Sequence, residues 1–209
     1  ISHWKVEYAH KGLFFEDVSM TLSHVQAFHS SYAGFDLAQG AQVQMSHITA
    51  QENRFGFQVQ AGASLTVTDS KITNNTETGF YFYGGGDENI SVVVRRSSIY
   101  GNQNLDVYQG FYTAQNPGSV FDFRENWWGT TDAWLIESKI VDHQDDPRRY
   151  GIYYGPFLTS EWGEVLPGNV VQGVIWQDTV WHKADGPFIA AGSVVVAHGA
   201  TLTIEAGTE

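Results

Sequence analysis

Several tyrosines occupy positions from which they could contact a carbohydrate. Tyr81 and Tyr83 alternate with apolar residues in one short segment, and Tyr108 holds a similar position in the next repeat of the chain. Gln58 and Asp106 occupy the corresponding positions of neighbouring segments. Aromatic rings stack on sugar rings, and amide and carboxylate oxygens accept hydrogen bonds from sugar hydroxyls. These five residues are our candidate carbohydrate-binding residues, with an ordinary exposed strand as the alternative, because tyrosine also favours strands.

Two histidines are candidates for a metal site. His24 and His47 occupy equivalent positions of successive repeats, where they would be neighbours close enough to share an ion. Two ligands are too few for a tight site. Lys5 and Lys71 hold the flanking positions and would repel a cation. A solvated polar face is therefore the stronger interpretation.

Three carboxylates lie close together in a later segment. Asp142, Asp145 and Asp146 could hold calcium through their oxygen atoms, as extracellular modules often do. Arg148 and Arg149 follow directly, so a local ion pair is the stronger interpretation. The sequence leaves the metal ligands unknown, with Ca²⁺ as the one candidate ion and no other cofactor expected.

Charged residues of both signs also recur at equivalent positions. Asp69, Arg96 and Glu125 follow one another, and Arg95 and Arg124 each precede a member of this series. A basic residue beside carboxylates could abstract the proton α to a uronate carboxylate. Alternating charge on neighbouring strands is also the pattern of structural ion pairs. Because no complete catalytic set or nucleophile elbow accompanies these residues, we assign no catalytic residue.

An internal repeat must position all these side chains. One recurring unit has a serine with an apolar residue three positions before it and another two positions after it. The serine position is filled in turn by Ser23, Ser46, Ser70, Ser97 and then Asn126. A second unit has glycine followed by an aromatic residue or leucine. Its glycine position is filled by Gly12, Gly34, Gly56, Gly79 and then Asn104.

This repeat predicts a parallel β-helix. Each unit holds two or three short strands and has no room for a crossover helix. A unit of about 22 residues built from strands and turns is one coil of such a helix. Stacked coils lie about 4.8 Å apart, so equivalent residues of successive coils form ladders. The glycine and asparagine positions fit turns with positive φ. The apolar residues after the serine position then form one internal stack, which consists of Val25, Ile48, Ile72, Ile99 and Trp128.

The chain resembles the right-handed parallel β-helix repeats of the pectate-lyase-like superfamily. The stretch 4–12 (WKVEYAHKG) is similar to a coil of its secreted members. The stretch 126–130 (NWWGT), followed by Asp145-Asp146 and by 155–158 (GPFL), resembles the segment that closes such helices in large bacterial and archaeal surface proteins. The resemblance covers about residues 1–162. It implies the fold and not an activity, because the superfamily includes lyases, hydrolases, epimerases and proteins without catalysis.

The chain is predicted to have three parts. Residues 1–162 form the β-helix and its closing segment, in which a short helix from Ala133 to Ile140, capped by Thr131 or Asp132, covers the open end. Residues 163–169 are a linker containing Pro167-Gly168. Residues 170–209 form strands that resemble the first coil of a following β-helix. Because both termini fall within repeats, we expect a piece of a tandem protein whose partners are other copies or domains of the same protein, end to end.

Composition narrows the function further. The 209 residues include 23 Asp and Glu against 11 Lys and Arg, a net charge of −12, which disfavours a nucleic-acid partner. Cysteine is absent, which excludes disulfides, zinc–thiolate sites and a cysteine nucleophile. No segment is long and apolar enough for membrane insertion.

These observations favour a module that is secreted or displayed on the cell surface. We expect a structural or adhesive part of a tandem or filament-forming surface protein, which could contact a polysaccharide. The alternative is a carbohydrate-active enzyme of the polysaccharide lyase, hydrolase or epimerase type, although a protein without catalytic activity is favoured.

Overall fold

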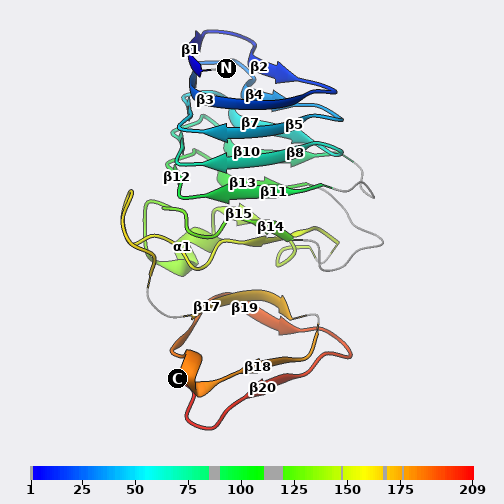
Figure 1. Cartoon of the computed structure of the whole chain (residues 1–209), viewed down its shortest axis with the longest axis vertical. Helices are drawn as coiled ribbons and strands as arrows, with labels where there is room; N and C mark the ends of the chain where they lie inside the picture. The colour runs from blue at the N-terminus through cyan, green and yellow to red at the C-terminus, as the bar shows by residue number, and fades with distance from the viewer. Residues whose placement is uncertain (1, 85–89, 111–119, 147, 167–168, 176) are drawn as a thin grey trace.

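A computed structural model describes residues 2–84, 90–110, 120–146, 148–166, 169–175 and 177–209. Nearly all of its regular structure consists of parallel strands that wind into successive coils along the longest axis of the molecule (Figure 1). One short α-helix and one 3₁₀ helix are the helical elements of the described residues. The predicted parallel β-helix is therefore confirmed.

The coils contribute strands to three faces. The first face consists of β3 (Ser19–Phe28), β5 (Gln42–Ser46), β8 (Ser64–Thr68), β11 (Val92–Arg95), β14 (Val120–Asp122) and β16 (Gly151–Tyr153). The second face continues from the end of β3 and includes β1 (Ser2–Glu7), β6 (Thr49–Gln51), β9 (Lys71–Thr73) and β12 (Ser98–Tyr100). The third face consists of β2 (Lys11–Phe15), β4 (Ala33–Leu37), β7 (Phe55–Gln60), β10 (Thr78–Tyr83), β13 (Leu105–Gln109) and β15 (Ile140–Val141).

The side chains predicted to stack inside the helix are all buried, but they belong to two adjacent columns. Ala27, Ala50, Ile72 and Ile99 pair in register on successive strands, whereas the backbone nitrogen of Ile48 lies opposite Ser70 and donates to its hydroxyl over 3.1 Å. The predicted alignment was therefore displaced by two residues between Ser46 and Ser70, since Ser46 pairs with Thr68. A slip of two residues preserves the alternation of inward and outward side chains, so burial could be predicted while the register was not.

Buried asparagines form a second internal ladder. The carboxamide oxygen of Asn75 accepts from the backbone nitrogen of Asn53 over 3.1 Å, and its nitrogen donates to the oxygens of Ala50 and Asn102 over 3.1 and 2.9 Å. The asparagines therefore satisfy backbone groups at a corner where the chain turns between two faces, and they connect three coils.

The glycines of the second repeated unit are needed for close approach and not for positive φ. A Cβ atom on Gly56 would lie 2.7 Å from the carbonyl oxygen of Gly79 and 2.8 Å from the side chain of Ile72. Positive φ recurs instead at three other turns of the coils, and at two of them side chains of many kinds adopt it. One of these corners is occupied in turn by His3, His24, His47, Asp69, Arg96 and Glu125.

A short helix follows the last full coil, but it ends earlier than predicted. Helix α1 spans Ala133–Glu137, and Asp132 caps it by accepting from the backbone nitrogens of Trp134 and Leu135. Ile136 is buried, whereas Trp134 and Leu135 are 75% and 58% exposed. Ile140, which was predicted to belong to this helix, begins β15 and pairs with Val107. The helix thus covers the core with one side chain, and strand pairing continues beyond it.

The remaining strands form two parallel pairs below this cap (Figure 1). They are β17 (Asn169–Ile175) with β19 (Phe188–Val196), and β18 (Thr179–Trp181) with β20 (Leu202–Ile204), and a 3₁₀ helix spans Lys183–Asp185. Strand β19 contacts the cap, because the backbone nitrogen of Ser193 donates to Gln144 over 3.0 Å. A Cβ on the adjacent Gly192 would lie 3.4 Å from a carboxylate oxygen of Glu137, whose pKa burial raises to about 7.

The boundaries of the predicted linker remain a prediction, and residues 167 and 168 within it lie outside the described set.

Candidate functional site

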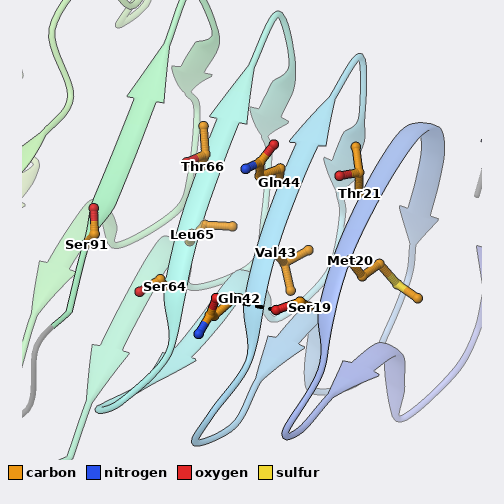
Figure 2. A pocket seen from close by; sticks show the side chains of 10 residues that line it. All are labelled: Ser19, Met20, Thr21, Gln42, Val43, Gln44, Ser64, Leu65, Thr66 and Ser91. Atoms are coloured by element: carbon orange, nitrogen blue, oxygen red, sulfur yellow. Dashed lines mark hydrogen bonds between the residues drawn. The ribbon is translucent and has the colours of Figure 1, made fainter.

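A polar groove of about 380 Å³ crosses the outer surface of the first face, over strands β3, β5 and β8 (Figure 2). Each strand contributes two polar side chains at alternate positions, and the six side chains form two rows because the strands are in register. One row consists of Ser19, Gln42 and Ser64, and the other consists of Thr21, Gln44 and Thr66. The hydroxyl of Ser19 donates to the amide oxygen of Gln42 over 3.3 Å.

The described lining of the groove offers hydroxyl and amide groups that can form hydrogen bonds. Its ten described lining residues comprise serine, threonine, glutamine and apolar side chains. Hydroxyl and amide groups can both donate and accept hydrogen bonds, which matches the hydroxyls of a sugar. The described lining is therefore suited to binding a ligand through hydrogen bonds. We did not single out these residues from the sequence, although the alternation of Ser, Thr and Gln in three successive repeats was a usable signal.

The three predicted tyrosines come together on the third face. Tyr81 of β10 pairs in register with Tyr108 of β13, and their rings stack with centroids 5.1 Å apart at an interplanar angle of 11°. Tyr83 lies beside them, with its ring centroid 6.0 Å from that of Tyr81. The predicted aromatic cluster therefore exists, while its contact with sugars remains a prediction.

The stacking continues beyond the tyrosines at both ends. The ring of Phe55 lies 4.7 Å from that of Tyr81, and the guanidinium of Arg54 lies 4.9 Å from the centroid of Phe55. At the other end, the guanidinium of Arg149 lies 5.1 Å from the ring of Tyr108. A cation thus covers each end of a continuous aromatic stack. Because neighbouring groups cover the ring faces of this stack, it offers a sugar mainly ring edges and hydroxyls.

The two polar residues predicted beside these tyrosines are buried. Gln58 pairs in register with Tyr81 but is only 2% exposed, and its amide donates to the hydroxyl of Tyr32 over 2.7 Å. Asp106 is 4% exposed and lies opposite Gly79. Its carboxylate accepts from the carboxamide of Asn102 over 2.7 Å.

The placement of Asp106 on the exposed tyrosine surface is therefore wrong. The alignment had placed Asn104 opposite Gly79, whereas the actual offset between β10 and β13 is 27 residues, as in the pair Phe80 and Val107. Asp106 thus occupies the inward glycine position and extends the asparagine ladder. Burial raises the pKa of Asp106 to about 6, although the hydrogen bond from Asn102 and the charge of Lys139 oppose this rise.

The charged residues considered for proton abstraction are engaged in ion pairs. Asp122 accepts from Arg95 and from Arg124, the latter with an Nη2 to Oδ2 distance of 2.8 Å. The Nη1 atom of Arg95 also lies 3.3 Å from a carboxylate oxygen of Glu125. Burial opposes ionisation of Asp122, but the hydrogen bonds from Arg124 outweigh it and lower the pKa of the carboxyl. These groups form a structural network, as alternating charges on adjacent strands predict.

The other predicted ion pairs also form. The Nε atom of Arg96 lies 3.7 Å from a carboxylate oxygen of Asp69, and Arg148 contacts Asp146 over 2.8 Å. The carboxylate of Asp142 is buried and accepts from the backbone nitrogens of Gln144 and Ile152. Among the residues that the structure describes, no three His, Asp or Glu side chains converge as a metal site requires. Calcium binding by this segment therefore remains a prediction without further support.

Comparison with known proteins agrees with this architecture. Residues 1–128 match the family model described as the right handed beta helix region, which is more than half of the chain. The chain therefore belongs to the right-handed β-helix family. It is also similar to Protein bark beetle of Drosophila melanogaster, with 33% identity over 103 residues, covering 43% of this chain and 3% of that protein. This chain thus spans only a small fraction of that relative's length.

No solved structure matches the chain. Within the described ranges, none of the helices has the length and hydrophobicity needed to cross a bilayer.

Proposed function

We propose that this chain is an extracellular structural or adhesive β-helix module that contacts a polysaccharide through the polar groove. The observation that carries the proposal is the pair of uncharged rows of hydroxyl and amide groups on three successive strands. Rows repeated about every 4.8 Å offer an extended chain of sugars many hydrogen-bonding groups of one kind. The ten described lining residues carry no titratable side chain, which favours binding over the alternative of a carbohydrate-active enzyme.

Replacing Gln44 with alanine should weaken glycan binding about tenfold, because one side chain in the middle of the groove supplies two kinds of hydrogen bond. A glycan array identifies the ligand, and calorimetry then compares the variants. Gln26→Ala is the matched control, since Gln26 is exposed on the second face and outside the groove. Equal loss in both variants, or the absence of any bound glycan, would contradict the proposal, and release of unsaturated products would support the enzyme instead.

We also propose that such modules associate end to end with other copies or domains of the same protein. Apolar side chains are accessible at both ends of the described solenoid. A hollow of about 580 Å³ at the first coil is lined by residues that include Leu13, Phe15 and Met20. At the opposite end, Val195 and Ile204 are 50% and 54% exposed. Both ends also present strand edges of the kind to which a further coil can add.

Ile204→Glu should abolish end-to-end association, because it places a charge in the apolar surface that a further coil would cover. Multi-angle light scattering over a range of protein concentrations measures the association of the 209-residue chain. Ala184→Glu is the control, since it adds the same charge at an exposed position of the 3₁₀ helix. If the unmodified chain stays monomeric at all concentrations, the proposed association is wrong.

A further inference from the structure

An exposed asparagine lies at the corner where the second face meets the third. Asn74 follows β9 and precedes β10, and its backbone adopts a positive φ of 56°. Asparagine is one of the few residues with a side chain that tolerate this conformation readily. The next residue, Asn75, is only 1% exposed and belongs to the internal asparagine ladder. Two adjacent asparagines therefore differ sharply in accessibility.

Residues 74–76 also form a motif for covalent modification. Asn74 is followed by Asn75 and Thr76, which is the Asn-X-Ser/Thr acceptor pattern of N-linked glycosylation with a residue other than proline in the middle. Thr76 is exposed, and its hydroxyl donates to the backbone oxygen of Asn53 over 3.3 Å. Asn75 does not begin such a motif, because Glu77 stands two positions after it. The motif therefore selects the exposed asparagine of the pair.

The neighbouring coils leave space for a large group on Asn74. Glu52 and Gly101 hold the equivalent corner position on the two adjacent coils, where both have positive φ and the flanking strands pair in register. A Cβ atom on Gly101 would lie 2.5 Å from the carboxamide oxygen of Asn74, so this side chain lies over a position that has none. On the other side, the carboxylate of Glu52 lies 3.1 Å from the imidazole of His29, which belongs to the coil before it. The surface at Asn74 is therefore open to solvent and toward Gly101.

We propose that Asn74 is an acceptor of an N-linked oligosaccharide, an inference that rests on the extracellular location proposed above. In this reaction the carboxamide nitrogen of Asn74 forms a bond to the anomeric carbon of an oligosaccharide carried on a lipid pyrophosphate. The bond between that carbon and the pyrophosphate oxygen breaks, the pyrophosphate leaves with the electron pair, and the carboxamide loses one proton. The backbone of the residue is unchanged, so the modified asparagine keeps the conformation of the corner.

The position of Asn74 keeps this oligosaccharide away from the surfaces assigned above. The polar groove lies on the first face over β3, β5 and β8, whereas Asn74 lies between the second and third faces. Further coils pair with its own coil on both sides, so the modification also leaves the two ends of the solenoid open. A bulky, solubilising group at this corner is therefore compatible with ligand binding and with end-to-end association.

Secretion of the 209-residue chain from cultured mammalian cells, behind a cleavable signal peptide, tests the inference. We expect mass spectrometry of glycopeptides from the secreted protein to locate an oligosaccharide on Asn74. Analysis by peptide is needed because Asn89-Ile90-Ser91 is a second such motif, whose asparagine lies outside the described residues. Asn74→Asp and Thr76→Val should each abolish modification at this position, since they remove the acceptor nitrogen and the required hydroxyl. Thr76→Ser should retain it.

Gly199→Asn is the matched control for access to the transferase. It creates the same motif with Ala200 and Thr201 at an exposed turn, where φ is also positive and an added Cβ has open space. An unmodified Asn74 in the secreted chain would overturn the inference, most directly when the Gly199→Asn variant from the same cells carries an oligosaccharide at the new site. Modification of Thr76→Val at the level of the unmodified sequence would overturn it as well. A glycan array with enzymatically deglycosylated protein tests the polar groove separately, so the two proposals can fail independently.

Discussion

Replacing Ile72 with aspartate should leave the chain unfolded at room temperature. Ile72 is 0% exposed, and its neighbours in register are Ala50 and Ile99, which are also fully buried. A carboxylate at this position would have no partner, and burying an unpaired charge costs several kcal/mol. Single domains have free energies of unfolding of only about 5–15 kcal/mol, so this loss consumes most of the available stability. Circular dichroism and the melting temperature measure the outcome.

Thr49→Asp is the matched control for this substitution. Thr49 precedes Ala50 on β6, is partly exposed, and pairs in register with Lys71 on the adjacent strand. The same carboxylate is therefore placed outside the core and near a positive charge. Substitutions at such surface positions usually change the free energy of unfolding by no more than about 0.5 kcal/mol. If Ile72→Asp melted at the temperature of the unmodified chain, the apolar column would not be internal.

The sequence predicts the coils of this protein well because burial follows a period of two. Val25, Ile48, Ile72 and Ile99 were all assigned to the interior correctly. The pairing of the coils was predicted less well, because a displacement by two residues within a strand preserves the alternation of inward and outward side chains. Only the hydrogen-bonded register distinguishes the alignments, and register depends on contacts between coils that a single repeat does not reveal.

The prediction of the candidate site was limited by a second displacement of two residues, which set Asn104 and not Asp106 opposite Gly79. Tyr81, Tyr83 and Tyr108 were grouped correctly because all three alternate with inward residues. Asp106 was placed with them because Asn104 was set opposite Gly79, which put Asp106 beside Tyr81 instead of at the buried position opposite Gly79. The polar groove was not predicted, since serine, threonine and glutamine on an exposed strand are unremarkable one by one. Their arrangement in two rows becomes evident only when three coils are superimposed.

A binding module and a rigid rod are compatible functions for this fold. Contacts within the solenoid join each coil to its neighbours, so stability accumulates along the axis and the outward positions are free to vary. The three outer surfaces have correspondingly different chemistry. The first face carries the polar groove, the third carries an aromatic stack with an arginine at each end, and one corner carries the stacked imidazoles of His3, His24 and His47. Function in such a protein resides in side chains that the core does not constrain.

Asp106→Asn should stabilise the protein at neutral pH. The folded pKa of Asp106 is about 6, compared with an ordinary value of 3.8. Each unit of difference corresponds to about 1.36 kcal/mol, so the ionised carboxylate costs the fold up to about 3 kcal/mol at pH 7. Asparagine is neutral, and its oxygen can still accept the hydrogen bond that Asn102 donates. We expect an increase of roughly 5–10 °C in melting temperature at pH 7, given about 2–4 °C per kcal/mol for a chain of this size.

The pH dependence of this gain distinguishes its cause from a simple packing effect. Below the unfolded pKa, Asp106 is protonated in both the folded and unfolded states, so the native chain bears no penalty there. As the pH rises through the window between about 4 and 6, the unfolded state ionises first and the stability of the native chain falls relative to the variant. The difference in melting temperature should thus be small at pH 4 and constant above about pH 7. Asp185→Asn, which removes an exposed carboxylate from the 3₁₀ helix, is measured at the same pH values as the control. A gain independent of pH, or a destabilised Asp106→Asn variant at pH 7, would mean that the buried carboxylate is not the source of the penalty.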